Sequence, residues 1–131
     1  MSTLKTSNIQ DTSGNNNSTP AQISNGRAKA WVKFDGTASD ISSTANGYNV
    51  DTITDNGTGD YTVNFTTAMT NANYAVAISG KANGGASAIP IPHYNDSGVM
   101  TTTSMTFFFS EATSYGTKRD SAIVSFVAFG D

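Results

Sequence analysis

The chain has 131 residues, a length that suits one domain with a single core. Charged residues make up 13% of it, against roughly 25% in globular proteins, and the formal net charge is -3. The seven Lys and Arg residues are scattered, which argues against nucleic-acid binding. Cysteine is absent, which excludes disulfides and thiolate metal sites.

Residues 1–26 differ from the rest of the chain. The run 11–20 is polar and rich in turn-forming residues, and Leu4, Ile9 and Ile23 are the sizeable apolar side chains after Met1. We expect an extended docking arm held by a partner, with a disordered tail as the alternative. The first ten residues contain no apolar run that could form a signal-peptide core, and no stretch of the chain is apolar enough to span a bilayer. We therefore expect synthesis in a cytoplasm, no secretion by that route and no membrane insertion.

From Arg27 onward the apolar pattern has a period of two, which predicts strands; no segment longer than one turn has helical periodicity. In 28–34 the small and apolar residues alternate with Lys29, Trp31 and Lys33. We expect Trp31 to pack under the lysine stems or against a neighbouring molecule, and a ligand cage is the alternative. This strand should end at Asp35-Gly36.

The segments 48–54 and 61–66 form the clearest predicted hairpin, with glycines in the connection 55–60. Tyr61, Val63 and Phe65 should form its buried face. Further strands are expected at 74–79, 104–110 and 121–129. The two prolines in 88–94 predict an edge strand or irregular backbone, after a flexible loop at 80–87.

The last two predicted strands are apolar on both faces. A small sandwich has one interior layer, so the second face needs a partner subunit or an overlying loop, and we favour a partner. The predicted assembly interface comprises Leu4, Ile9, Phe108, Ile123, Val127 and Phe129. The predicted fold is all-β: an antiparallel β-sandwich of about seven or eight short strands over 27–131, preceded by the arm 1–26.

Catalytic patterns are missing from the sequence. His93 is the single histidine, Glu111 is the single glutamate, and the aspartates lie mostly in turns. The segment 55–60 resembles half of a calcium loop but lacks its distal glutamate, so a plain turn is the favoured interpretation. We expect no enzyme activity, no metal and no cofactor. The polar, weakly ionic composition is typical of virion proteins, extracellular fibres and sugar-binding domains.

Several motifs resemble a module found in tail fibres and other virion proteins of tailed bacteriophages, especially marine ones. They lie within residues 27–79 and are Ala30-Trp31-Val32, the block Ile53–Phe65 and the pair Asn73-Tyr74. The opening Ser2–Gln10 resembles the leader of short proteins from such phages. The resemblance covers about half of the chain. It implies a virion protein, made in the bacterial host cytoplasm.

The function expected from this resemblance is host attachment by a surface-displayed homotrimer, whose arm binds other virion proteins. A capsid decoration protein whose arm clamps major capsid subunits is the main alternative, and a free carbohydrate-binding module is a third. Loop residues are expected to contact a host surface glycan, with many weak contacts acting together. The predicted receptor contacts are Lys81, Asn83, His93, Tyr94 and Asn95.

Overall fold

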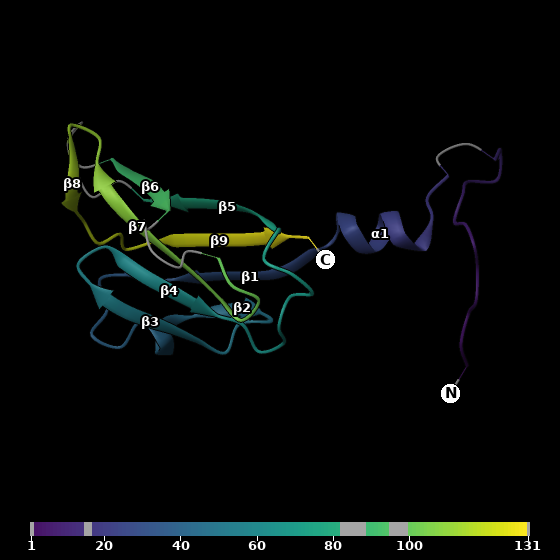
Figure 1. The fold of residues 1–131 in the computed structure, drawn as a ribbon, viewed down its shortest axis with the longest axis horizontal. Helices are drawn as coiled ribbons and strands as arrows, with labels where there is room; N and C mark the ends of the chain where they lie inside the picture. Colours follow the sequence, from purple (N-terminus) through teal and green to yellow (C-terminus); the bar gives the residue numbers. More distant parts are fainter. Residues whose placement is uncertain (1, 15–16, 82–88, 95–99, 131) are drawn as a thin grey trace.

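A computed structural model describes residues 2–14, 17–81, 89–94 and 100–130. Two antiparallel sheets pack face to face, and an N-terminal arm extends from one end of them (Figure 1). The all-β sandwich predicted from the sequence is confirmed. The elements are α1 (Pro20–Gly26), β1 (Ala28–Phe34), η1 (Ser42–Thr44), β2 (Asn46–Tyr48), β3 (Thr52–Gly57), β4 (Asp60–Asn64), β5 (Ala75–Gly80), β6 (Pro90–Tyr94), β7 (Ser104–Glu111), β8 (Ser114–Lys118) and β9 (Val124–Phe129).

The first sheet has the order β2-β1-β9-β5, and the second has the order β3-β4-β7-β6 with β8 also paired to β7. The described residues therefore form nine strands rather than seven or eight. The additional strands are the short β2 and β8, in which every residue is exposed. Neither shows the apolar alternation by which strands are predicted. The proline-containing β6 is an edge strand, as predicted.

The core lies between the two sheets and consists of alternate residues from their strands. Phe107 of β7 stacks on Phe126 of β9, with ring centroids 6.2 Å apart and planes at 11°. Tyr61, Val63 and Phe65 are all buried, as the hairpin pattern predicted. Burying these aromatic rings between the sheets supplies much of the hydrophobic stabilisation of the fold.

The hydroxyl group of Tyr61 is the main polar feature of this core. It donates to the Gly36 carbonyl oxygen at 3.1 Å and lies 3.0 Å from the Asp120 carboxylate. Burial and the bond to Asp120 raise the pKa of Tyr61. Residue 36 must be glycine, because a Cβ there would lie 2.3 Å from the Tyr61 hydroxyl oxygen. The turn predicted at Asp35-Gly36 therefore closes one end of the core.

Asn49 marks the point where the chain crosses from the first sheet to the second. Its φ of 56° lies in the left-handed region, which is uncommon for residues other than glycine. The side chain fastens three segments, because its Nδ2 donates to the carbonyl oxygens of Lys29 (3.0 Å) and Thr67 (3.1 Å), and its Oδ1 accepts from the Thr67 amide (2.7 Å). Tyr48 thus belongs to β2 in the first sheet, and the hairpin begins only at Thr52.

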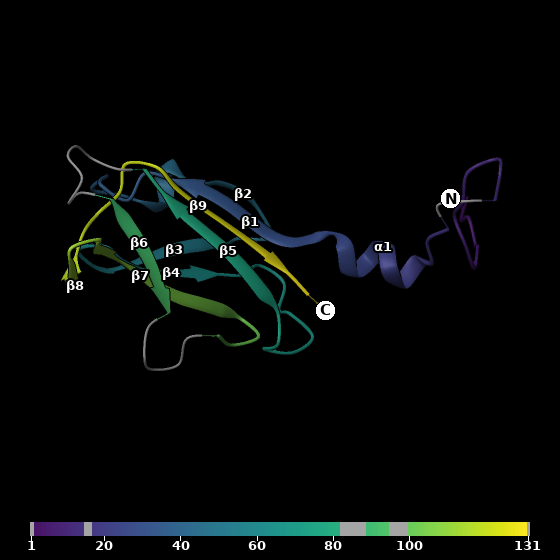
Figure 2. The ribbon, with the colours of Figure 1, turned by 90° about the horizontal axis from the view of Figure 1, so that it is seen from above.

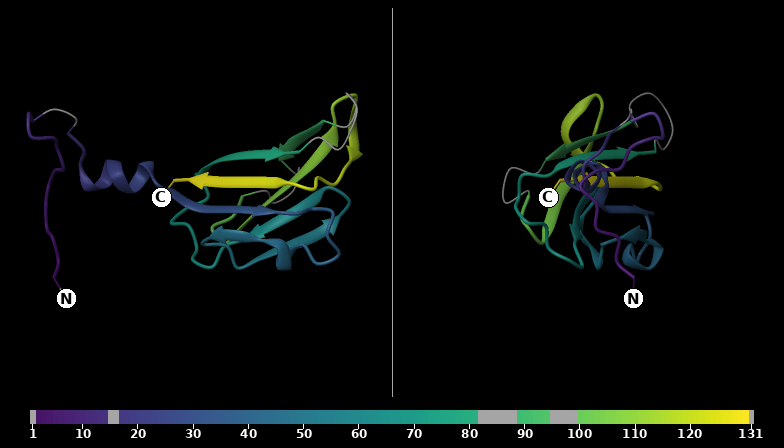
Figure 3. Two further views of the ribbon diagram at one scale, coloured as in Figure 1. Left: turned by 180° about the vertical axis from the view of Figure 1, so that it is seen from behind. Right: turned by 90° about the vertical axis from the view of Figure 1, so that its right-hand side faces the viewer.

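The arm contains a helix, α1, that the apolar pattern of the sequence does not predict. Thr19 and Gln22 form a reciprocal capping box at its start, and Pro20 occupies the first helical position. Upstream, Ile9 and Ser18 exchange two backbone hydrogen bonds of 2.8 Å, so the arm doubles back on itself. Figures 2 and 3 show that α1 continues away from the sandwich, roughly in line with its strands. No residue of α1 is buried.

Candidate interaction surfaces

The outer face of β3 and β4 in the second sheet is polar, and its side chains bond to one another and to Thr106 of β7. Thr62 and Thr106 lie across β4 and β7 with their hydroxyl oxygens 2.8 Å apart. Asn64 donates to the Thr54 hydroxyl at 2.9 Å, and Asn56 donates to the Thr62 hydroxyl at the same distance. Side chains of this kind are compatible with water on their open side, as expected for the solvent-facing side of an antiparallel sheet.

The outer face of the first sheet is different, because it presents large apolar groups. Tyr48, Trp31, Val127 and Ala77 lie directly opposite one another on β2, β1, β9 and β5, so they form one row across all four strands. Trp31 is 42% exposed and Tyr48 is 59% exposed. Trp31 is therefore only partly covered within the chain, and its packing under the lysine stems stays a prediction.

A second apolar group lies on this face beside the root of the arm. Phe129 is 40% exposed and is paired with Ala28 on β1 and with Ala75 on β5. Ile123, which precedes β9, is 38% exposed. Of the predicted assembly residues, the structure thus brings Val127 and Phe129 together on one face and leaves Ile123 accessible at the other end of β9.

Phe108 is a correction to the predicted assembly interface. It lies on the outer side of β7, but it is only 7% exposed because neighbouring strands cover it. His93 of β6 stacks on its ring at 5.0 Å, and the Lys118 ammonium of β8 lies 5.0 Å from the ring centroid. The ring of the exposed Tyr115 also lies against Phe108, with the ring centroids 6.4 Å apart. A second subunit is therefore unnecessary to shelter Phe108.

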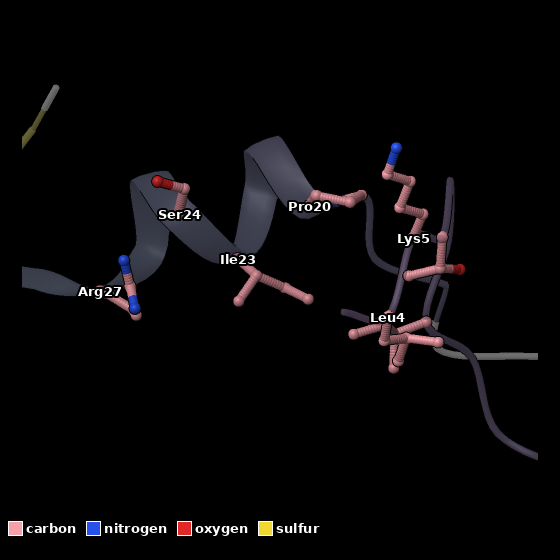
Figure 4. A pocket seen from close by; sticks show the side chains of 8 residues that line it. Leu4, Lys5, Pro20, Ile23, Ser24 and Arg27 are labelled. Atoms are coloured by element: carbon pink, nitrogen blue, oxygen red, sulfur yellow. The ribbon is translucent and has the colours of Figure 1, made fainter. Parts of the chain in front are cut away.

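The arm carries its apolar side chains on the surface. Leu4 is 85% exposed, Ile9 53% and Ile23 38%. They line an open hollow of about 540 Å³ between the extended segment and α1, together with Pro20 and Arg27. Figure 4 shows Leu4 and Ile23 among the side chains that line this hollow. The predicted contacts Leu4 and Ile9 are thus available to a partner.

Three of the predicted receptor contacts lie in the described part of the chain, and they fall in two separate places. His93 and Tyr94 line a hollow of about 250 Å³ between the edge strands β5 and β6, with Val76, Ile78 and Pro92. Lys81 follows the far end of β5, where its backbone amide donates to the Ile123 carbonyl oxygen at 2.9 Å. Asn83 and Asn95 lie outside the described residues.

Two acidic residues, Glu111 and Asp60, form ion pairs. Arg119 donates to the Glu111 carboxylate through Nε at 2.9 Å and also through Nη2, and Lys118 pairs with the buried Asp60. Among the described residues, no group of three His, Asp or Glu side chains is placed to hold a metal ion. No described helix has the length and hydropathy of a membrane span.

The pairing of Tyr48 with Trp31 was not predicted, although one residue signals it. Gly47 lies opposite Val32, and a Cβ on Gly47 would lie 2.3 Å from the Trp31 carbonyl oxygen. Glycine at this position therefore permits close approach of β2 to β1.

Comparisons of the chain with protein-family models, with curated proteins and with solved structures found no match.

Proposed function

We propose that this chain is a non-enzymatic structural subunit of a tailed-phage virion, of the tail-fibre or attachment type. Copies would associate as a homotrimer, and the arm would dock on other virion proteins. The observation that carries the proposal is the contrast between the two outer faces of the sandwich. The second sheet presents hydrogen-bonded Thr and Asn side chains on β3 and β4, and its outer Phe108 is covered by the chain itself. The first sheet presents a row of apolar side chains across all four strands, in which Tyr48, Trp31 and Ala77 are exposed and Val127 is partly exposed.

The contact between copies is assigned to the neutral half of the first sheet, which comprises Val127, Phe129, Ala75 and Ala77. Burial of such side chains against another copy removes apolar area from water at roughly 25 cal/mol per Å². The β1 side of the same sheet carries Lys29 and Lys33. Two copies that met on that side would bring like charges together, which costs free energy.

The arm supports the docking role because it extends away from the sandwich, and the apolar side chains of the arm are uncovered. The arm joins the sandwich beside Phe129, because Ala28, the first residue of β1, pairs with Phe129. Association through the neutral half would therefore place the arms of neighbouring copies near one another at the same end of the assembly. Several arms then act together on the particle, and multivalency strengthens their attachment.

Light scattering of the purified full chain tests the association. We expect a mass near three times the protomer mass of 13.6 kDa. Val127→Asp should reduce it to the protomer mass, because it places a carboxylate in the apolar contact. Thr54→Asp introduces the same group on the opposite, solvated face and should leave the mass unchanged. A native chain that remains a protomer at high concentration would refute the proposed association.

Electron microscopy of particles that carry the protein tests the virion role. A few copies located at the tail would support attachment. Hundreds of copies over the head would instead support capsid decoration, which shares the fold and the arm.

A further inference from the structure

Charge is segregated between the two sheets. The strands of the first sheet contain two charged residues, Lys29 and Lys33, and no Asp or Glu, and Arg27 directly precedes β1. The strands of the second sheet contain three acidic residues and one lysine. The first sheet is therefore locally positive in a chain whose formal net charge is -3.

The positive groups surround two exposed aromatic rings. Lys33 lies two residues from Trp31 on the same strand, so both side chains project from the outer face. On the other side, Arg27, Lys29 and Tyr48 line one hollow of about 240 Å³. We call Arg27, Lys29, Trp31, Lys33 and Tyr48 the basic half of this face.

The cations of the basic half are available to an anionic partner. Lys29 donates from Nζ to the Ser24 hydroxyl at 3.1 Å, an uncharged contact that holds its chain beside the hollow. The acidic residue nearest to Lys33 in the sequence is Asp35, whose carboxylate accepts from the Thr37 amide (2.9 Å) and hydroxyl (2.6 Å). Lys33 itself is exposed.

We propose that the basic half binds an acidic polysaccharide. The exposed faces of Trp31 and Tyr48 can pack against the apolar faces of sugar rings, while Lys29, Lys33 and Arg27 pair with carboxylate, sulfate or phosphate groups on the same polymer. Charge complementarity favours this occupant over a second copy, whose basic half would repel this one. The inference rests on the proposed attachment function and names the class of receptor that such a function requires.

Trp31 is the only tryptophan in the chain, so its fluorescence reports on this surface directly. We would titrate the full chain with dextran sulfate, alginate, neutral dextran and a single-stranded oligodeoxynucleotide. We expect a blue shift or quenching with dextran sulfate or alginate and no change with neutral dextran. A response to one of these polyanions alone would show whether sulfates or carboxylates are preferred. Binding should weaken as the salt concentration rises, because salt screens exposed charges.

Charge variants locate the site. The double variant Lys29→Gln/Lys33→Gln should weaken polyanion binding at least about tenfold, since each charge-assisted contact is lost. Lys5→Gln removes one exposed positive charge on the arm, outside the first sheet, and should change binding less than about twofold. Thermal unfolding of each variant verifies that the fold is retained.

Three results would overturn the inference. They are the absence of a response to both anionic polysaccharides, tighter binding of the oligonucleotide, and a shift of Trp31 emission on raising the protein concentration alone. The last would mean that another copy covers Trp31. The mass from light scattering on the same samples tests self-association separately, so failure of the receptor assignment and failure of the proposed assembly can be told apart.

Discussion

His93 lies flat over Phe108, with ring centroids 5.0 Å apart and planes at 22°, and the two residues are directly opposite on β6 and β7. The same histidine places Nε2 2.7 Å from the Ser110 hydroxyl oxygen, which fixes the orientation of its ring. Phe108, on the outer side of β7, is therefore covered by the chain itself. This arrangement separates a residue that stabilises the protomer from residues available for assembly.

Substitution of Phe108 should consequently affect stability and leave assembly intact. We expect Phe108→Ala to lower the free energy of unfolding by about 3 kcal/mol, because it empties a packed site. Phe129→Ala removes a ring that is 40% exposed, so the protomer should lose at most about 1 kcal/mol while self-association weakens. Urea unfolding at low concentration and light scattering measure the two effects. If Phe108→Ala abolished the oligomer and Phe129→Ala did not, the assignment of the contact to the neutral half would be contradicted.

The buried tyrosines predict a loss of stability at high pH. Burial raises the pKa of Tyr74 from its ordinary value of 10.0 to about 12, and burial with the Asp120 bond raises that of Tyr61 further. Above pH 10 the unfolded chain releases these protons first, so the free energy of unfolding falls as pH rises from about 10 to about 12. Denaturant unfolding over this range measures it. Tyr74→Phe should reduce the slope, and an unchanged slope would contradict the account.

Asn49 should be sensitive to substitution because two properties are combined there. Asn49→Ala removes the bonds to Lys29 and Thr67 and keeps a left-handed backbone, so we expect a loss of about 2–3 kcal/mol in unfolding free energy. Asn49→Gly also loses the bonds but tolerates the φ of 56°, so it should be less destabilising by about 1 kcal/mol. Equal losses in the two variants would show that the backbone conformation does not matter.

The capping box of α1 should be independent of sandwich stability. The double variant Thr19→Ala/Gln22→Ala removes the cap and destabilises α1 by about 1 kcal/mol. Since no residue of α1 is buried, the thermal midpoint of the sheet signal in circular dichroism should change by less than about 1 °C. A shift of several degrees would mean that the arm packs on the sandwich.

The period-two pattern predicted most of the strands and the inward-facing residues, because alternation depends only on neighbours in sequence. It could not predict that His93 and Tyr115 cover Phe108, since their positions follow from the order of β6, β7 and β8 in the sheet. The pairing of Tyr48 with Trp31 likewise depends on a contact between distant segments.

The apolar pattern does not predict the helix α1, for a different reason. Its apolar content is low, so no amphipathic period is visible, but Thr19-Pro20-Ala21-Gln22 contains both a capping box and a proline at the first helical position. The basic half shares no residue with the receptor contacts predicted from the sequence. The charged residues around Trp31 were visible in the sequence, whereas Tyr48 and the segregation of charge between sheets required the fold.

Hydroxyl-radical footprinting of aromatic side chains tests the central claim, that copies associate through the neutral half of the first sheet, most directly. Labelling of the native chain is compared with labelling of Val127→Asp, using Tyr115, which is 75% exposed on the other sheet, as the internal reference. We predict that Phe129 is protected in the native chain and becomes labelled in Val127→Asp, while Trp31 and Tyr115 are labelled in both. Equal labelling of Phe129 in the two proteins would contradict the account.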